Sequence, residues 1–217
     1  MLGEPVSVYV TRAIVFMVAM TVHEFAHAYI AYQNGDPTAK DMGKMSLNPI
    51  KNINPVGYLM GVFLGFGFLG SVPVVAQRMR NPRWGMFQAV LAGPISNLLL
   101  AAVFAVPLRF GLVQPEATPT EGLIPTLGFL LFYMVFLNVL LFVFNLIPLF
   151  PLDGWTIVLA ALPPGPAVDW QRYQQASYYV FLGLILLSFV AGGSPLNILR
   201  YVVLIPTQLI TVGLIGG

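Results

Sequence analysis

Five stretches of this chain are long and apolar enough to cross a lipid bilayer, at about residues 8–33, 86–110, 123–147, 176–191 and 196–215. A spanning helix needs roughly 20 predominantly apolar residues. Only 8% of the 217 residues are charged, against about 25% in soluble domains. The sequence therefore predicts an all-α polytopic membrane protein of about five transmembrane helices. We expect residues 1–217 to form a single membrane-embedded domain with no separate soluble domain.

Charge and cysteine content narrow the functional classes. The net charge of +2 is too small to indicate a nucleic-acid partner, and the chain has no cysteine for disulfides or thiolate metal ligands. We expect the first apolar run to stay in the mature protein, because Glu4 replaces the basic start of a signal peptide and no A-x-A site follows. Arg12 inside this run should reach the interface or pair within the bundle, with Glu4 as the candidate partner.

The distribution of charge predicts the topology. Six of the ten basic residues lie between Lys40 and Arg83, and the positive-inside bias places this region on the cytoplasmic side of the cell membrane. The connector at residues 111–122 contains two glutamates and no Lys or Arg, and is expected on the outer side. Both placements can hold only if the apolar segment within the basic region enters and leaves the membrane on the same side.

That segment, at about residues 55–76, is rich in glycine and is a poor candidate for a straight helix. A re-entrant loop or a β-hairpin packed within the protein satisfies the topology. The alternative is a full-crossing helix that packs through Gly61-x-x-x-Gly65.

Both histidines of the chain lie in one motif inside the first apolar run, His23-Glu24-Phe25-Ala26-His27. On a helix, positions i and i+4 share a face, so both imidazoles can bind one metal ion with Glu24 beside them. Glu24 would then be placed to take a proton from water. The alternative is a chance motif in which each histidine forms hydrogen bonds within the bundle. Ionisable groups inside a membrane span are costly and by default functional, which favours the metal site.

A catalytic zinc ion usually has three protein ligands, and without a third His or a Cys the third must be a carboxylate. Asp153 is the best placed, because Pro148 and Pro151 break the preceding helix and turn the chain inward. The alternative is that Asp153 caps a short helix beginning near Trp155. The acidic residues after Glu24 are Asp36, Asp41, Glu116, Glu121, Asp153 and Asp169.

Depth in the membrane favours the re-entrant alternative. The histidines lie about 9–15 Å inside the cytoplasmic end of the first run, at about 1.5 Å per residue. The chain then crosses outward through residues 86–110 and back through residues 123–147, which returns Asp153 to the cytoplasmic side. A full crossing by residues 55–76 would place Asp153 on the wrong side. The predicted site therefore lies within the bilayer, toward the cytoplasmic face.

In combination, these motifs resemble the site-2 proteases, the intramembrane zinc metalloproteases of peptidase family M50. The resemblance covers about residues 14–160. The matching elements are His23-Glu24-Phe25-Ala26-His27, Gly35-Asp36-Pro37-Thr38-Ala39-Lys40, Ser46-Leu47-Asn48-Pro49, Gly93-Pro94-Ile95-Ser96-Asn97 and Asn145…Pro148…Pro151-Leu152-Asp153-Gly154.

The resemblance implies a function for each site residue. One Zn²⁺ ion per chain would be bound by His23, His27 and Asp153, with Glu24 as the catalytic base. The side chains that would line the site and steady the substrate backbone or the oxyanion are Asn97 and Asn145. The substrates would be transmembrane proteins, such as anti-sigma-factor-like regulators or signal-peptide remnants, cleaved in or near their membrane segment. A substrate unwound for cleavage could pair with a strand edge of residues 55–76.

Two departures from the family pattern are visible. Lys51-Asn52-Ile53-Asn54-Pro55 stands where relatives commonly have a His and an Asp before the Pro, and connectors under 30 residues indicate a short form without PDZ or CBS domains.

A transporter that uses the His/Glu/Asp cluster as a substrate site is the main alternative function, although the motif is not repeated in the second half. An inactive scaffold is disfavoured because every catalytic position is filled.

Overall fold

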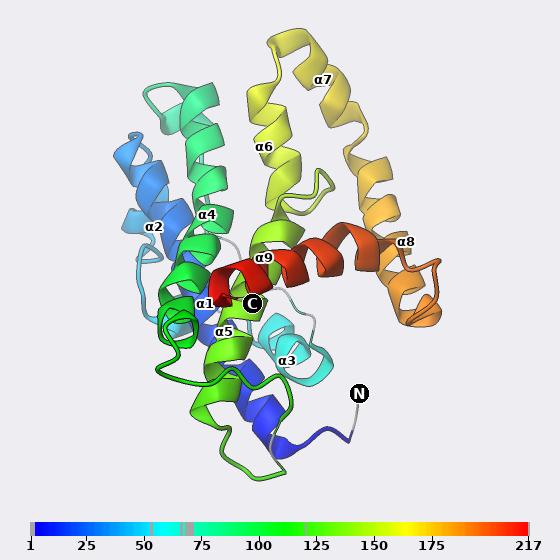
Figure 1. Cartoon of the computed structure of the whole chain (residues 1–217). Coiled ribbons are helices and arrows are strands. Elements are labelled where there is room, and N and C mark those ends of the chain that lie inside the picture. Colours follow the sequence, from blue (N-terminus) through cyan, green and yellow to red (C-terminus); the bar gives the residue numbers. More distant parts are fainter. Residues whose placement is uncertain (1–2, 53, 66, 68–71, 120, 217) are drawn as a thin grey trace.

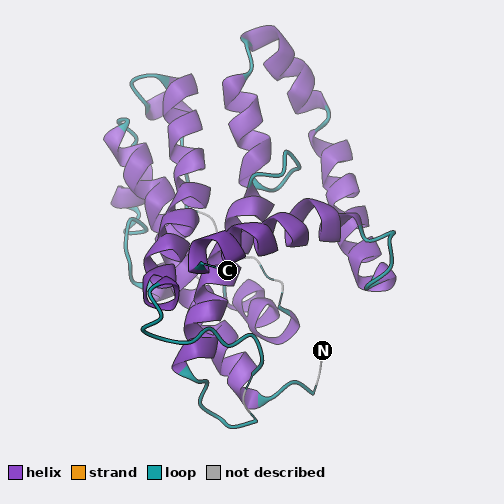
Figure 2. Ribbon diagram, viewed as in Figure 1, coloured by secondary structure: helices purple, strands orange, loops and turns teal. Residues whose placement is uncertain are grey.

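The computed structural model describes residues 3–52, 54–65, 67, 72–119 and 121–216, and every regular element in that part of the chain is helical (Figure 2). The all-α prediction is therefore confirmed for the described residues. The helices are α1 (Val6–Gln33), α2 (Thr38–Asp41), α3 (Pro55–Leu64), α4 (Pro82–Arg109), α5 (Leu127–Asn145), α6 (Asp153–Ala161), α7 (Pro164–Arg172), α8 (Gln174–Ala191) and α9 (Ile205–Ile215), with the short turns η1 (Pro49–Lys51), η2 (Ala76–Arg78) and η3 (Arg200–Leu204).

Four of the described helices, α1, α4, α5 and α8, are long and apolar enough to cross a membrane, which makes the chain a multi-pass membrane protein. Two of them, α4 and α5, follow a polar residue whose side chain accepts a hydrogen bond from a free backbone N–H group in the first turn of the helix. The Asn81 side chain accepts from the Trp84 N–H at the start of α4, and the Thr126 hydroxyl accepts from the Phe129 N–H at the start of α5.

Helices α1, α4 and α5 form the centre of the molecule, where α4 packs against both of the others (Figure 1). On the α1 side, Phe16 and Ala19 pack with Leu137 of α5. Small residues of α4, including Ala101 and Ala105, let the backbone of α5 approach closely. Helix α8 stands apart from this centre (Figure 1), and most of its side chains are exposed.

The break between α5 and α6 occurs where the sequence predicts it. Helix α5 ends at Asn145, the Phe150–Pro151 peptide bond is cis, and α6 begins at Asp153. Beyond the break, α6 continues past the end of α5 and packs against α4 (Figure 1). Asp153 is thus placed inside the helical bundle, at the end of a helix rather than in its middle.

Two expectations about the membrane segments are not confirmed. Residues 200–215 form a shorter apolar helix that lies across α4 and α5 instead of alongside them (Figure 1), so a fifth spanning helix is not established. In the glycine-rich segment, α3 has ten residues and ends at Leu64, and the next residue, Gly65, has a φ of 71°. A helix of about 15 Å is too short to cross a bilayer. Residues 66 and 68–71 lie outside the described part, so the re-entrant loop or hairpin stays a prediction.

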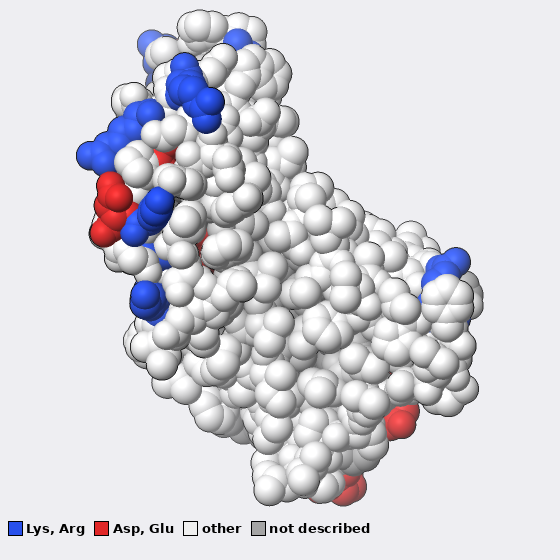
Figure 3. Space-filling model, turned by 90° about the vertical axis from the view of Figure 1, so that its left-hand side faces the viewer, with Lys and Arg blue, Asp and Glu red and all other residues white. Residues whose placement is uncertain are grey.

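Charged side chains are distributed unevenly over the surface. Most of the Lys and Arg side chains in Figure 3 gather toward one end of the molecule, with carboxylates among them, whereas carboxylates without neighbouring Lys or Arg lie at the opposite end. The expected pairing of Arg12 is confirmed, since its Nη2 lies 3.0 Å from Glu4 Oε2.

Candidate metal centre

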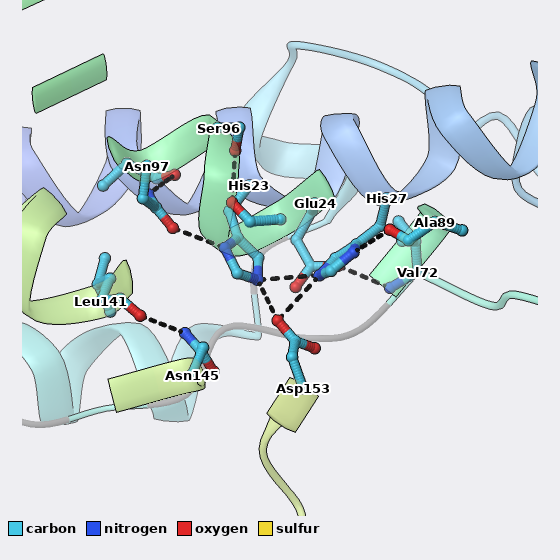
Figure 4. Close-up of polar contacts among 12 residues, drawn as sticks. His23, Glu24, His27, Val72, Ala89, Ser96, Asn97, Leu141, Asn145 and Asp153 are labelled. Carbon is cyan, nitrogen blue, oxygen red and sulfur yellow. Dashed lines mark hydrogen bonds and ion pairs between the residues drawn. The ribbon is translucent and has the colours of Figure 1, made fainter. Parts of the chain in front are cut away.

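Two histidines one turn apart on α1 form the centre of a buried polar cluster (Figure 4). His23 is 3% exposed and His27 is 7% exposed. Their Nε2 atoms lie 2.9 Å apart, as the i, i+4 spacing on one helix face permits.

The third member of the cluster is Asp153, the first residue of α6. Its Oδ2 atom lies 3.2 Å from His23 Nε2 and 3.3 Å from His27 Nε2 (Figure 4). The N-cap position of α6 belongs to Leu152, so Asp153 does not take the capping role considered as its alternative. The structure thus brings together the three residues that the sequence proposes as ligands.

The contacts around the histidines determine which ring nitrogen carries the proton. His23 Nδ1 lies 2.6 Å from Asn97 Oδ1, and His27 Nδ1 lies 2.8 Å from the carbonyl oxygen of Ala89. A carbonyl oxygen can only accept, so both Nδ1 atoms donate, and the Nε2 atoms are the ring nitrogens that face Asp153. Outer partners of this kind are typical of metal-binding histidines.

The donor set fits a metal cation. The three ligand atoms of His23, His27 and Asp153 lie within 4.8 Å of one another. Asp153 Oδ2 is buried and has no hydrogen-bond partner among the described residues. Two imidazole nitrogens and a carboxylate oxygen therefore converge on one point inside the bundle. A cation at that point would contact all three groups, and two imidazoles with one carboxylate are a common catalytic zinc set.

Asn97 of α4 links His23 to the rest of the bundle. Its Oδ1 accepts from His23, while its Nδ2 donates to Asn138 Oδ1 at 2.9 Å and to the Ala19 carbonyl oxygen at 3.2 Å. Asn97 and Asn138 are both fully buried. Because both amide hydrogens of Asn97 are in use, its side chain has no donor left for a substrate oxyanion.

Glu24 lies beside the histidines but outside the group of three ligand atoms. It is 6% exposed, and its Oε2 accepts the Val72 N–H at 2.8 Å. Its Oε1 has no hydrogen-bond partner among the described residues. One oxygen is therefore fixed by the segment after the glycine-rich stretch, and the other is free to accept a proton.

Asn145 lies near the cluster at the end of α5 (Figure 4). Its Nδ2 donates to the Leu141 carbonyl oxygen of its own helix at 3.0 Å. It makes no hydrogen bond to His23, His27 or Asp153. Asn145 is only partly buried, so it belongs to the wall of the site rather than to its interior.

Gly93 allows α4 to pass close to the histidines. A Cβ at this position would lie 2.3 Å from His27 Nε2 and 2.8 Å from His23 Cε1. These distances are shorter than any van der Waals contact. Only glycine fits here without displacing the imidazoles.

Asp36, just beyond α1, fixes the segment that contacts Glu24. Its Oδ2 accepts the Val75 N–H at 2.7 Å, and its Oδ1 accepts the Thr38 N–H at 3.0 Å and the Thr38 hydroxyl. Burial favours a higher pKa for Asp36, but these hydrogen bonds and the nearby Arg78 outweigh it and lower the pKa below its ordinary value. The carboxylate therefore holds residues 72–75 against α1.

Sequence reasoning missed several of these contacts. Asn138 could have been noticed in the sequence, because it is an amide in the middle of the apolar run of α5, where polar residues often have a function. The sequence marks Asp36 as an acidic residue within a family motif but does not indicate which backbone groups it binds. The Val72 N–H and the Ala89 carbonyl oxygen are backbone groups, and no residue type in the sequence marks them.

Comparisons with known proteins show the family to which the chain belongs. A model of peptidase family M50 matches residues 11–188. The protein named "Putative zinc metalloprotease YwhC" of Bacillus subtilis is 38% identical over 183 residues, which cover 83% of this chain and 82% of that protein. "Zinc metalloprotease MJ0392" of Methanocaldococcus jannaschii is 26% identical over 149 residues, which cover 69% of this chain and 33% of that protein.

"Putative zinc metalloprotease Rip2" of Mycolicibacterium smegmatis is 28% identical over 176 residues, covering 76% of this chain and 64% of that protein. The chain thus spans most of the Bacillus relative and just under two thirds of the mycobacterial one. No solved structure gives a significant match. With the buried His/His/Asp cluster, the family match and four helices that can cross a membrane, the chain belongs to peptidase family M50 and is an intramembrane zinc metalloprotease.

Proposed function

We propose that His23, His27 and Asp153 bind one zinc ion and that Glu24 is the general base for hydrolysis of peptide bonds in or near the transmembrane segment of membrane-protein substrates. The convergence of two Nε2 atoms and Asp153 Oδ2 carries this proposal. When bound, zinc would supply the Lewis acidity that polarises a scissile carbonyl and makes water more acidic.

Glu24 would move the proton in this reaction. Its Oε2 is held by the Val72 N–H, which leaves Oε1 to accept a proton from the attacking water and pass it to the leaving amine. Because the side chain is buried, bulk water does not compete for that proton. Asn97 would position His23 rather than bind substrate, and Asn145 remains the candidate contact for the substrate backbone or the oxyanion.

The substrate would bind as an extended peptide, because a helix hides its scissile bonds. Residues 72–75 form no regular structure in the described part, and Val75 has extended backbone angles. They lie directly beside Glu24, so they could pair with such a peptide through backbone hydrogen bonds. If so, Val74→Pro should reduce turnover while zinc content stays normal. Unchanged turnover would remove this segment from substrate binding.

The proposed substrates are transmembrane proteins, with anti-sigma-factor-like regulators and signal-peptide remnants as the candidate classes. The basic end of the molecule would face the cytoplasm, because positively charged loops are retained on that side. The protein would act in the cell membrane, with its active site toward the cytoplasmic face.

Zinc content per chain tests the ligand assignment. We expect about one zinc in detergent-purified wild type and in Asp169→Ala, and none in Asp153→Ala. Asp169 is an exposed carboxylate on α7 that pairs with Arg172, so it is a matched control. Equal zinc in all three proteins would exclude Asp153 as a ligand.

Turnover of a transmembrane reporter in liposomes tests the catalytic role. Glu24→Gln should keep its zinc and lose turnover by about 100-fold or more, because it keeps the shape of the side chain but cannot act as a base. A variant that loses zinc as well would instead make Glu24 part of the metal site, as expected for an ion-transport protein.

A further inference from the structure

The chain between the end of α5 and Asp153, residues 146–152, is here called the ligand segment, and a hydrogen bond from α8 holds it. Its two prolines have no backbone N–H, and four of its other five N–H groups donate to carbonyl oxygens of residues 143–149. The fifth, that of Phe150, donates to Ser177 Oγ on α8 at 2.9 Å. Because a backbone N–H without an acceptor is costly inside a membrane protein, this bond stabilises the observed path of the ligand segment.

The buried side chains of α8 lie at the same contact. Ser177 and Phe181 are the two buried residues of this otherwise exposed helix. Ser177 accepts from Phe150, and the Phe181 ring packs on Phe144 near the end of α5, with 6.2 Å between ring centroids. The Tyr178 ring adds an edge-on contact with Phe150 at 6.1 Å. Helix α8 therefore docks on the chain leading to the metal cluster, and in Figure 1 the loop between α5 and α6 points toward α8.

The hydrogen bond to Ser177 is close enough to the metal cluster to affect its geometry. Phe150 lies three residues before Asp153, so the two stay within about 10 Å of each other even in an extended chain. Asp153 Oδ2 lies 3.2 Å from His23 Nε2 and 3.3 Å from His27 Nε2. Metal–ligand distances are fixed to about 0.2 Å. A small displacement of the ligand segment is therefore enough to weaken metal binding.

We propose that Ser177 is a positioning residue for the zinc site, whose hydroxyl holds the ligand segment so that Asp153 Oδ2 meets the two histidines. Helix α8 is thereby coupled to metal binding. The inference rests on the proposed assignment of Asp153 as a zinc ligand. Coupling between two sites is reciprocal, so bound zinc should in turn stabilise the contact between α8 and the ligand segment. A contact that served only to hold α8 in the fold would show no such coupling.

Three serine variants of the full chain in detergent test the proposal. Ser177→Ala removes the acceptor, Ser177→Thr keeps it, and Ser188→Ala removes a hydroxyl about 16 Å further along α8. Zinc affinity is measured by competition with an indicator, and the absorption spectrum of the Co²⁺-substituted protein reports the geometry of the ligands. We expect Ser177→Ala to bind zinc about 3- to 10-fold more weakly, with an altered Co²⁺ spectrum, and the other two variants to match wild type. A lower Tm of Ser177→Ala with unchanged zinc affinity and Co²⁺ spectrum would overturn the proposal.

Hydrogen exchange of the wild type provides a second measurement that needs no variant. Zinc should slow exchange at residues 174–181 of α8, and exchange there that does not respond to zinc would overturn the proposal even if Ser177→Ala failed to fold. Asp153→Ala separates this inference from the ligand assignment. If Asp153→Ala binds zinc as wild type does, the ligand assignment fails and this inference fails with it. If Asp153→Ala loses zinc while Ser177→Ala binds it normally, the positioning role of Ser177 alone is wrong.

Discussion

Gly93 is the residue at which one added methyl group should disturb the candidate metal site most directly. The Cβ of Gly93→Ala would lie 2.3 Å from His27 Nε2, so the imidazole or the whole of α4 must shift. We expect zinc affinity to fall by about tenfold or more, because outer contacts of metal ligands have effects of that size. Gly183→Ala on α8 is the control, since a Cβ there meets nothing within 4 Å. Equal zinc affinity in both variants would contradict the close approach of α4.

Asn97 should affect zinc through His23 alone. Asn97→Ala removes the acceptor that keeps the proton on His23 Nδ1, so the ring can turn or change tautomer. We expect zinc affinity to fall by about 10- to 100-fold, while KM at saturating zinc changes little. Titration with a zinc indicator and steady-state kinetics measure the two effects. A raised KM with normal zinc affinity would restore the substrate-binding role that the sequence suggests.

Asp36 should make stability depend on acid pH. The pKa of its carboxyl is lowered in the folded protein by the Thr38 and Val75 hydrogen bonds, so the ionised form stabilises the fold. That contribution is complete above the unfolded pKa of about 3.9 and is lost as the pH falls through the lower folded pKa. Thermal unfolding of Asp36→Asn should therefore depend less on pH below about 4. Asp41→Asn, which removes an exposed carboxylate nearby, should behave as wild type.

At the residue scale, the sequence indicates which side chains could bind a metal ion, but it does not indicate the groups that hold those side chains in position. His23, His27 and Asp153 follow from the motif spacing and from the need for a carboxylate, and the structure brings them together. The sequence does not indicate the Ala89 carbonyl oxygen, which orients His27, or the Asn138 side chain, which holds Asn97 in place. These contacts join positions far apart in the chain, so they appear only once α1, α4 and α5 are packed.

At the scale of elements, the break between α5 and α6 determines where Asp153 lies. A Cβ on Gly154 would lie 2.3 Å from the Ile147 carbonyl oxygen and 2.5 Å from that of Leu146. Gly154→Ala should therefore push the start of α6 away from the end of α5 and carry Asp153 with it. We expect a lower zinc content after dialysis against a weak chelator. Gly165→Ala on α7, where a Cβ meets nothing within 4 Å, should retain zinc as wild type does.

Helix boundaries could be predicted where local chemistry sets them. Pro148 and Pro151 end α5 because proline removes a backbone donor and clashes with the preceding turn. The glycine-rich segment is harder, because α3 forms from Pro55 despite its glycines and is capped by the Asn54 side chain. Its apolar contacts with α1 outweigh its low helix propensity. Propensity alone therefore does not predict this element.

At the scale of the whole molecule, apolar length predicts which segments can enter the membrane but not how each one lies. Residues 6–33, 82–109 and 127–145 form long helices close to the expected bounds. The last apolar run has a similar composition, yet in the structure it lies across α4 and α5. Hydropathy does not distinguish a helix that crosses the bilayer from one that packs over its neighbours, because both bury apolar side chains.

The orientation of the whole molecule can be tested with introduced cysteines, because the chain contains none of its own. Asp41→Cys lies at the end that carries the basic residues, and Glu121→Cys lies in the acidic connector, where both positions are exposed. If the basic end faces the cytoplasm, a membrane-impermeant maleimide should label only Glu121→Cys in intact cells and only Asp41→Cys in inside-out vesicles. The opposite pattern would reverse the topology and place the metal cluster toward the outer face. Labelling of both on one side would mean that an even number of crossings separates the two positions, so that residues 55–76 would have to cross the membrane in addition to α4.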